Sequence, residues 1–177
     1  MRMRIKSVCG ISAFLVLAGL AISGGCARKT KGLFTKAELV TFQRLAVLGL
    51  TAEQEQIFMA SYIKAFRGKA ITFVERALLH EVISEQDLLQ GRIDEKSRAK
   101  VQKIFGVEAL IICTYYDESG SVGTKKLRVR IVDSTTGAIV GSVITQGRDN
   151  FEYHCKAAVK ALDADLYSGD HYKYLDQ

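Results

Sequence analysis

The order of hydrophobic patterns predicts an α/β (α+β) fold, with a mixed sheet of about five strands packed against about four helices in the order βαβααβββα. Residues 44–50 are, after Arg44, a continuous apolar run of strand length, and residues 109–115 are a near-continuous one, as in strands buried on both faces. Residues 127–131 alternate apolar and basic, as in a strand with one buried face. Residues 151–166 gather their apolar side chains on one face of a helix.

A helix is expected directly after the first strand. Thr51 and Gln54 fit a capping box, in which each side chain bonds the backbone N–H of the other. The apolar face of this helix has the spacing i, i+4, i+7 and i+8 and consists of Phe58, Tyr62, Ala65 and Phe66. Gly68 is placed to end the helix. Residues 70–74 then predict a second strand.

Two more helices are expected before the central strand. The first begins near Arg76 and has helical spacing at Leu79, Val82 and Ile83. Gly91 interrupts the chain, and Asp94 is a suitable N-cap for the next helix. The buried stripe expected on that helix consists of Val101, Ile104 and Phe105.

The C-terminal half predicts a three-stranded meander and a long helix. Turns are expected at residues 117–124 and 133–137, so the last strand covers 138–145. Asp149 or Asn150 caps the final helix. Its apolar stripe consists of Phe151, Cys155, Ala158, Val159, Leu162 and Leu166.

The N-terminus has the pattern of a secretory signal. Arg2, Arg4 and Lys6 precede an apolar stretch that is shorter than the roughly 20 residues of a membrane-spanning helix. It ends in Ser-Gly-Gly followed by Cys26, which resembles the lipobox of lipoproteins, although an aliphatic residue usually stands where Ser23 does. We therefore expect lipidation at Cys26. The alternatives are a soluble secreted protein and an uncleaved N-terminal anchor.

These features divide the 177 residues into four parts. Residues 1–25 are the expected signal peptide, 26–43 a lipidated N-terminus and short tether, 44–168 the folded domain and 169–177 a tail. Of 25 basic residues, three leave with the signal, so 22 stand against 19 acidic residues. This small excess gives no reason to expect nucleic acid as a partner.

Two cysteines remain in the domain. Cys113 lies in an apolar strand and Cys155 on the apolar stripe of a helix, so both are expected to point into the core. They are either two buried free thiols or a disulfide, which the periplasm permits. The histidines His80, His154 and His171 show no metal-ligand spacing, so we expect neither a metal nor a cofactor.

The sequence contains no recognisable catalytic motif. Glu81 and Glu85 beside His80 allow acid–base chemistry, but they also fit the solvated face of a helix. The candidate interaction patch consists of Tyr116, Lys125, Arg128 and Arg130. It could meet anionic lipid headgroups or an acidic protein, or simply be the wet face of a half-buried strand.

Several segments together resemble the CsgG family, which comprises the curli secretion channel and related envelope lipoproteins. The first lies between Val74 and Asp94 and includes Glu75-Arg76, Leu79, Glu85-Gln86, Leu88 and Gly91. The others are Phe105–Leu110, Leu127–Asp133 and the turn at Thr136-Gly137. The resemblance covers residues 44–166. In the channel, two long hairpins are inserted where this chain has only residues 117–124 and 146–150, so it resembles the bare core domain of the family.

The resemblance, together with the lipobox, implies a non-catalytic adaptor or assembly factor for an envelope machine. Its expected location is the periplasmic face of the outer membrane, because Ala27 rather than Asp follows the lipidated Cys26. Its expected partners are the membrane, an envelope protein and a second copy of the chain. The alternative is an envelope enzyme or a small-ligand-binding module with its site in loops at one end of the sheet.

Overall fold

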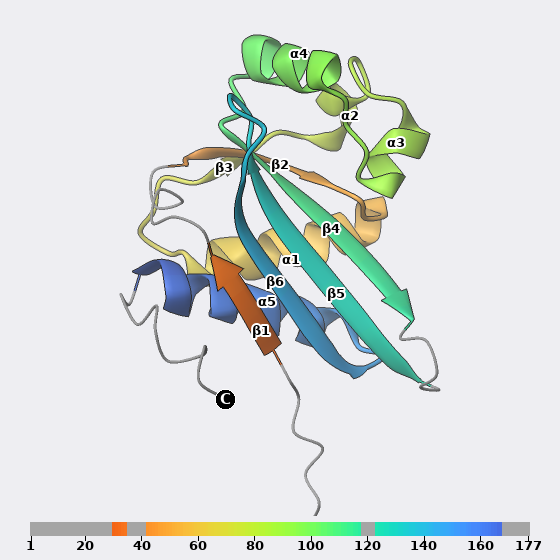
Figure 1. The fold of residues 1–177 in the computed structure, drawn as a ribbon, viewed down its shortest axis with the longest axis vertical. Coiled ribbons are helices and arrows are strands. Elements are labelled where there is room, and N and C mark those ends of the chain that lie inside the picture. Colours follow the sequence, from red (N-terminus) through yellow and green to blue (C-terminus); the bar gives the residue numbers. More distant parts are fainter. Residues whose placement is uncertain (1–29, 35–41, 118–122, 168–177) are drawn as a thin grey trace, which may run out of the picture.

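The computed structural model describes residues 30–34, 42–117 and 123–167 (Figure 1). The strands are β1 (Thr30–Phe34), β2 (Arg44–Leu48), β3 (Thr72–Phe73), β4 (Ala109–Asp117), β5 (Thr124–Asp133) and β6 (Ile139–Arg148). The helices are α1 (Ala52–Ala65), α2 (Arg76–Leu79), α3 (Glu85–Gln90), α4 (Glu95–Phe105) and α5 (Phe151–Tyr167). The expected signal peptide, Cys26 and the tail at 169–177 lie outside these residues.

All six strands form one mixed sheet in the order β1-β6-β5-β4-β2-β3. Strand β2 runs parallel to both β3 and β4, whereas β4, β5, β6 and β1 pair antiparallel. The predicted α/β class and mixed sheet are therefore confirmed. Among the described helices, none is long and apolar enough to cross a membrane.

Two hydrophobic clusters lie on opposite faces of the sheet. Helices α1 and α5 cover one face through apolar residues that include Phe58, Leu162 and Val159. Helices α2, α3 and α4 cover only one end of the other face, where Leu88 and Val101 are fully buried. Figure 1 shows this asymmetry, with α2–α4 gathered at one end of the long strands. No helix of the described residues covers the rest of the second face.

The helix starts follow the predicted chemistry. Thr51 and Gln54 form the complete capping box of α1, and Asp94 accepts the backbone N–H of Ser97 at 2.6 Å at the start of α4. Asn150, one of the two predicted caps of α5, accepts the N–H of Tyr153 at 2.9 Å. These caps satisfy N–H groups that a helix cannot satisfy internally.

The N-terminal tether is shorter than predicted, because residues Thr30–Phe34 form the edge strand β1. Thr30 pairs with Thr145, and Phe34 with Gly141. The segment lacks the alternation of a half-buried strand, since Lys31 and Gly32 stand at its centre. Backbone bonding to β6 therefore places it in the sheet.

The single helix predicted from Arg76 is two short helices, α2 and α3. Ser84 has extended backbone angles and accepts the N–H of Asp87, so it starts α3 and interrupts the helical path. Leu79 and Ile83 are nevertheless buried, as their spacing suggested. The strand predicted at 70–74 is reduced to the two residues of β3.

The predicted stripe on α4 was wrong at one position. Val101 and Phe105 are buried, but Ile104 is 59% exposed. Only one narrow face of α4 contacts the sheet, and Ile104 lies beside that face.

Gly49 allows the chain to leave β2 close to the neighbouring strand. Its φ is +86°, and a Cβ at this position would stand 1.9 Å from the carbonyl oxygen of Cys113. Its N–H donates to the carbonyl of Leu88 at 2.6 Å, which fixes α3 against the end of β2. A residue with a side chain would clash here as well as being strained.

Candidate functional site

The uncovered part of the second sheet face is basic. In β5, Leu127, Val129 and Ile131 point into the core, so Lys126, Arg128 and Arg130 point to the other side. Their cross-strand partners on this face are Ile112, Thr114 and Tyr116 of β4 and Ser142, Ile144 and Gln146 of β6. None of these outward residues is acidic. We call Thr114, Tyr116, Lys126, Arg128, Arg130 and Ile144 the open face.

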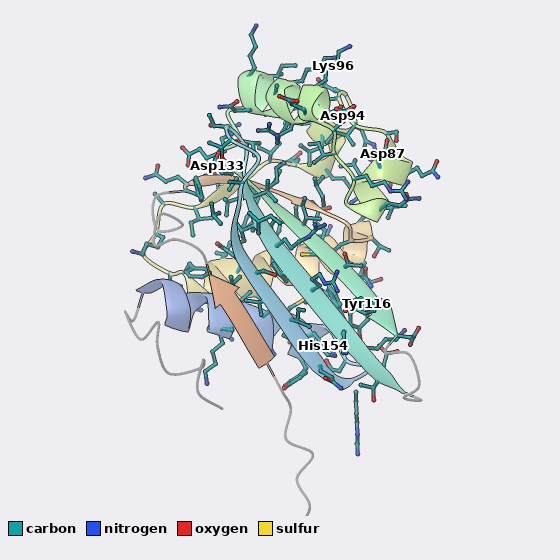
Figure 2. The ribbon with its side chains drawn as sticks, viewed as in Figure 1. Asp87, Asp94, Lys96, Tyr116, Asp133 and His154 are labelled. Carbon is teal, nitrogen blue, oxygen red and sulfur yellow. The ribbon has the colours of Figure 1, made fainter. Side chains whose placement is uncertain are left out.

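Three of the four predicted patch residues lie together on the open face. The Arg128 guanidinium lies 5.7 Å from the ring centre of Tyr116 and donates to its hydroxyl at 3.5 Å. Arg130 follows two residues later on the same side of β5. Figure 2 labels Tyr116 far from helices α2–α4.

Lys125 does not belong to this patch, and its inclusion was wrong. It lies on the opposite face, 2.8 Å from the Asp117 carboxylate and 5.6 Å from the ring centre of Tyr115. Side chains alternate along a strand, so Lys125 shares the side of Leu127 rather than that of Arg128. The hydrogen bond with Asp117 raises the pKa of Lys125.

A polar pocket of about 490 Å³ lies between Arg130 and the starts of α3 and α4. Arg130 lines it together with Ile112, and its buried Nε has no hydrogen-bond partner within the described part of the chain. The charged residues of the pocket, Asp87, Arg92, Asp94 and Arg130, carry no net charge. Figure 2 labels Asp87 and Asp94 at this end of the molecule. Backbone hydrogen bonding by Ser97 lowers the pKa of Asp94.

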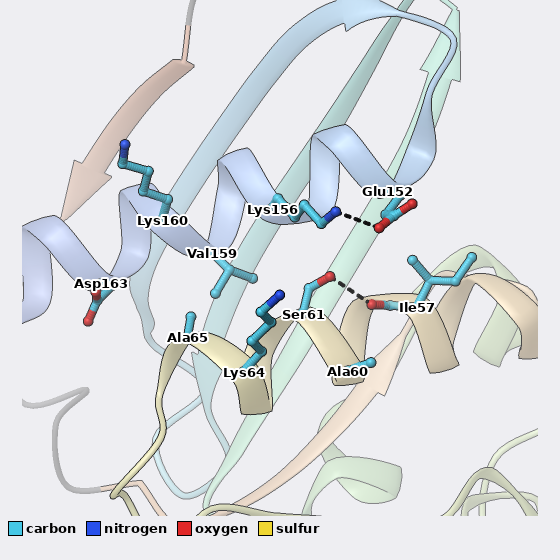
Figure 3. A pocket seen from close by; sticks show the side chains of 10 residues that line it. All are labelled: Ile57, Ala60, Ser61, Lys64, Ala65, Glu152, Lys156, Val159, Lys160 and Asp163. Carbon is cyan, nitrogen blue, oxygen red and sulfur yellow. Dashed lines mark hydrogen bonds and ion pairs between the residues drawn. The ribbon is translucent and has the colours of Figure 1, made fainter.

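A second hollow, a groove of about 570 Å³, follows the contact between α1 and α5 (Figure 3). Its apolar lining includes Ile57 and the buried Val159. The hydroxyl of Ser61 donates to the Ile57 carbonyl at 2.9 Å, and Lys156 pairs with Glu152 at 2.5 Å. Because the Ser61 hydroxyl is bonded within its own helix, Ser61 is not an activated nucleophile.

The acidic residues beside His80 belong to an ion-pair network. Arg76 donates to Glu55 at 2.9 Å, to Glu85 at 2.6 Å and to the Leu50 carbonyl at 3.0 Å. The Nε2 of His80 lies 2.6 Å from Glu85. Burial raises the pKa of the Glu55 carboxyl, whereas the hydrogen bond from Arg76 lowers that of Glu85.

This network joins α1, α2 and α3, because Arg76 of α2 binds Glu55 of α1 and Glu85 of α3. Glu81, which the sequence grouped with Glu85, is exposed and lies outside it. The role of Arg76 at the centre of this network was not predicted from the sequence, because its partners Glu55 and Leu50 are more than twenty residues away in the chain.

Both domain cysteines are buried in the cluster beneath α1 and α5, as expected, and both are free thiols in this structure. Burial raises the pKa of Cys113 well above its usual value and that of Cys155 to about 12. Within the described ranges, no group of three or more His, Cys, Asp or Glu side chains could hold a metal ion.

Comparison with known families confirms the resemblance inferred from the sequence. Residues 69–125 match the family described as "Curli production assembly/transport component CsgG". Residues 69–125 of this chain are therefore CsgG-like. The matched segment runs from before β3 to the start of β5, so the CsgG-like segment includes α2–α4 and most of the lining of the polar pocket. A comparison with curated proteins found no match.

Three solved structures are similar to this chain. The PelC dodecamer from Paraburkholderia phytofirmans has 10% identity and a TM-score of 0.47, covering 78% of this chain and 96% of that one. The LpoB C-terminal domain from Salmonella enterica has 17% identity and a TM-score of 0.45, covering 60% and 83%. Lipoprotein GNA1162 from Neisseria meningitidis has 17% identity and a TM-score of 0.41, covering 74% and 98%. With TM-scores below 0.5, these likenesses carry no argument about function.

Proposed function

We propose that this chain is a lipoprotein anchored through Cys26 to the periplasmic face of the outer membrane, where its CsgG-like domain acts as a non-catalytic adaptor or assembly factor. The signal and lipobox pattern of residues 1–26 supports the anchor. The matched family, described as a component of assembly and transport, supports the role. The proposal requires an envelope protein partner and allows a homo-oligomer, but involves neither nucleic acid nor cofactor.

The open face is the observation that carries the adaptor role. It combines a tyrosine and an arginine, which are enriched at protein interfaces, with the apolar side chain of Ile144. Its positive charge is not balanced by any outward carboxylate of β4, β5 or β6. Such a surface favours an acidic partner, because complementary charge increases the association rate and suppresses wrong partners.

Site-specific photo-crosslinking in intact cells tests this role. A photoreactive residue at Thr114, which is exposed on the open face, should give one discrete protein adduct. The same residue at Lys156, exposed on α5, is the matched control. Arg128→Glu should abolish the adduct from Thr114. An adduct that forms equally from both positions, or that survives Arg128→Glu, would refute the open face as the partner site.

Lipidation is tested separately with Cys26→Ser. This variant should incorporate no radioactive palmitate and should leave the membrane fraction or accumulate as precursor, because the acceptor thiol is gone. An unlabelled wild-type chain would end the lipoprotein proposal, whatever the result of crosslinking.

One observation favours the alternative of a small-ligand-binding module. The unpartnered Nε of Arg130 is a charged donor that an oxygen of a ligand could satisfy. Because Asp87 and Asp94 share the pocket with Arg92 and Arg130, a zwitterion fits better than a simple anion or cation. A volume of about 490 Å³ is within the range of small-molecule sites.

Nuclear magnetic resonance titration with trialanine tests this alternative. Shifts confined to the pocket should disappear when the amino or carboxyl terminus of the peptide is blocked. They should weaken in Asp94→Asn, which removes the charge but retains a good helix cap. Arg128→Gln, outside the pocket, is the control. Equal shifts with free and blocked peptides would argue against a zwitterion site.

A further inference from the structure

Strand β1 limits how far the domain can lie from its lipid anchor. Its first residue, Thr30, follows Cys26 by four residues. An extended chain spans at most about 3.6 Å per residue, so Thr30 lies within about 14 Å of the lipidated cysteine. Strand β5, with ten residues, is about 33 Å long. The anchor can therefore hold only the end of the sheet at which β1 begins.

The pairing of β1 shows which end this is. Thr30 pairs with Thr145 of β6, Thr145 pairs with Leu127 of β5, and Leu127 pairs with Tyr115 of β4. In Figure 1, β1 begins at the end of the sheet where β4 ends and β5 begins, opposite α2–α4. We call this end of β4, β5 and β6 the anchored end.

The anchored end is basic, whereas the opposite end is not. The spacer and the strand ends contain six basic residues, which are Arg28, Lys29, Lys31, Lys125, Lys126 and Arg148. Among the described residues of the strand ends, the acidic ones are Asp117, which is paired with Lys125, and Asp149. The nearby Glu152 is paired with Lys156, and in the sequence Glu118 follows Asp117. Residues 75–108, which hold α2–α4, contain seven acidic and six basic residues. The positive charge thus lies next to the lipid.

Tyr116 adds an aromatic side chain at the same end. It is half-buried, and its strand partner is Lys126. Tyrosine suits a membrane interface, because its ring is apolar and its hydroxyl is polar. Basic residues beside a lipid anchor are attracted to anionic headgroups and strengthen a single anchor.

From the register, the spacer length and the charge, we infer that the anchored end rests on an anionic lipid surface. The strands then rise from the membrane, and α2–α4 point away from it. Tyr116 and Lys126 lie at the lipid surface, and the rest of the open face is directed sideways toward a partner. The inference depends on the lipidation of Cys26 in the proposed function. A chain lying with α2–α4 against the lipid would have the opposite orientation.

Tryptophan fluorescence can measure this orientation, because the chain contains no tryptophan of its own. Tyr116→Trp places a reporter at the anchored end, and Ile104→Trp places its matched control on the exposed side of α4. Both are made in the lipidated full chain and bound to vesicles of phosphatidylethanolamine and phosphatidylglycerol with brominated acyl chains. Tyr116→Trp should lose emission to bromine quenching, and Ile104→Trp should not.

Charge variants test the cause of the contact. Lys126→Gln with Arg148→Gln should reduce the quenching of Tyr116→Trp, whereas Lys96→Gln with Lys100→Gln on α4 should not. Salt near 1 M, where the Debye length is about 3 Å, should reduce it as well. Vesicles of phosphatidylcholine alone should also reduce it, since they lack anionic headgroups.

Flotation of the vesicles separates the two hypotheses. A lipidated chain that fails to float with the vesicles refutes the anchor, and with it the proposed function. A chain that floats but shows equal quenching at both positions, or quenching that is independent of anionic lipid, refutes the orientation alone. Stronger quenching of Ile104→Trp would establish the reverse orientation.

Discussion

At the scale of single residues, His154 is a fully buried polar group with hydrogen-bond partners at both ring nitrogens. Its Nδ1 lies 2.7 Å from the hydroxyl of Thr145, and its Nε2 lies 3.0 Å from the carbonyl oxygen of Arg148. A carbonyl oxygen can only accept, so Nε2 carries a hydrogen. In the tautomer with that single hydrogen, Nδ1 accepts from the Thr145 hydroxyl, which also lies 3.4 Å from the Leu127 carbonyl oxygen. These two hydrogen bonds of His154 hold the start of α5 against the end of β6.

Thr145→Val should lower the free energy of unfolding by about 1–3 kcal/mol, because a buried acceptor loses its donor while the shape is conserved. Urea unfolding of the chain without signal and Cys26 measures this loss. Thr114→Val, the same change at an exposed position of β4, should stay within about 0.5 kcal/mol of the parent. Equal unfolding midpoints for the two variants would show that the His154 pair contributes nothing.

The sequence pattern predicted only some residues of the open face. The alternation of Leu127, Val129 and Ile131 already implies that Arg128 and Arg130 share a face and that Lys125 lies on the other. The polar pocket could not be predicted, because it joins Arg130 to loops about forty residues earlier. Such contacts depend on how α3 and α4 pack against the sheet, and the hydrophobic period of a sequence carries no information about that packing.

At the scale of elements, α5 tests the packing of the larger layer. Leu162 is fully buried, so Leu162→Ala should leave a cavity and lower the free energy of unfolding by about 2–5 kcal/mol. Lys160→Ala, at an exposed position of the same helix, should change it by less than about 0.5 kcal/mol. Urea unfolding compares the two variants. Similar midpoints would mean that α5 does not depend on the sheet for its stability.

Long elements with a regular apolar period were predicted well, and short ones were not. The stripe of α5 and the cap of α4 follow from local spacing and hydrogen bonding, which the sequence displays directly. Strand β1 is fixed by backbone bonds to β6, more than one hundred residues away, and its own residues carry no strand pattern. The division of α2 from α3 depends on Ser84, which starts a second helix although the apolar period of the sequence continues through it.

At the scale of the whole molecule, the sheet separates two hydrophobic clusters, whose helices must keep their positions relative to each other. Helix α1 belongs to one cluster, and α2 and α3 belong to the other. Arg76 connects them by binding Glu55 of α1 and Glu85 of α3. Because Glu55 is only 3% exposed, its carboxylate depends on Arg76 for compensation.

Removing this connection should destabilise the domain in a pH-dependent way. Arg76→Gln leaves the Glu55 carboxylate buried without its cation, which should lower the free energy of unfolding by about 3 kcal/mol at neutral pH. Arg67→Gln, at an exposed position after α1, should change it by less than about 0.5 kcal/mol. Urea unfolding at several pH values measures both variants.

The destabilisation by Arg76→Gln should shrink as the pH falls. Burial raises the pKa of Glu55, so on acidification the folded state binds a proton before the unfolded chain does, and protonation relieves the buried charge. Glu85 acts in the same direction. The lowered pKa of Glu85 stabilises the parent chain at pH values above the ordinary glutamate pKa. This contribution depends on Arg76 and is lost as the pH falls below that ordinary pKa. A difference between parent and Arg76→Gln that stays constant or grows on acidification would contradict the assigned network.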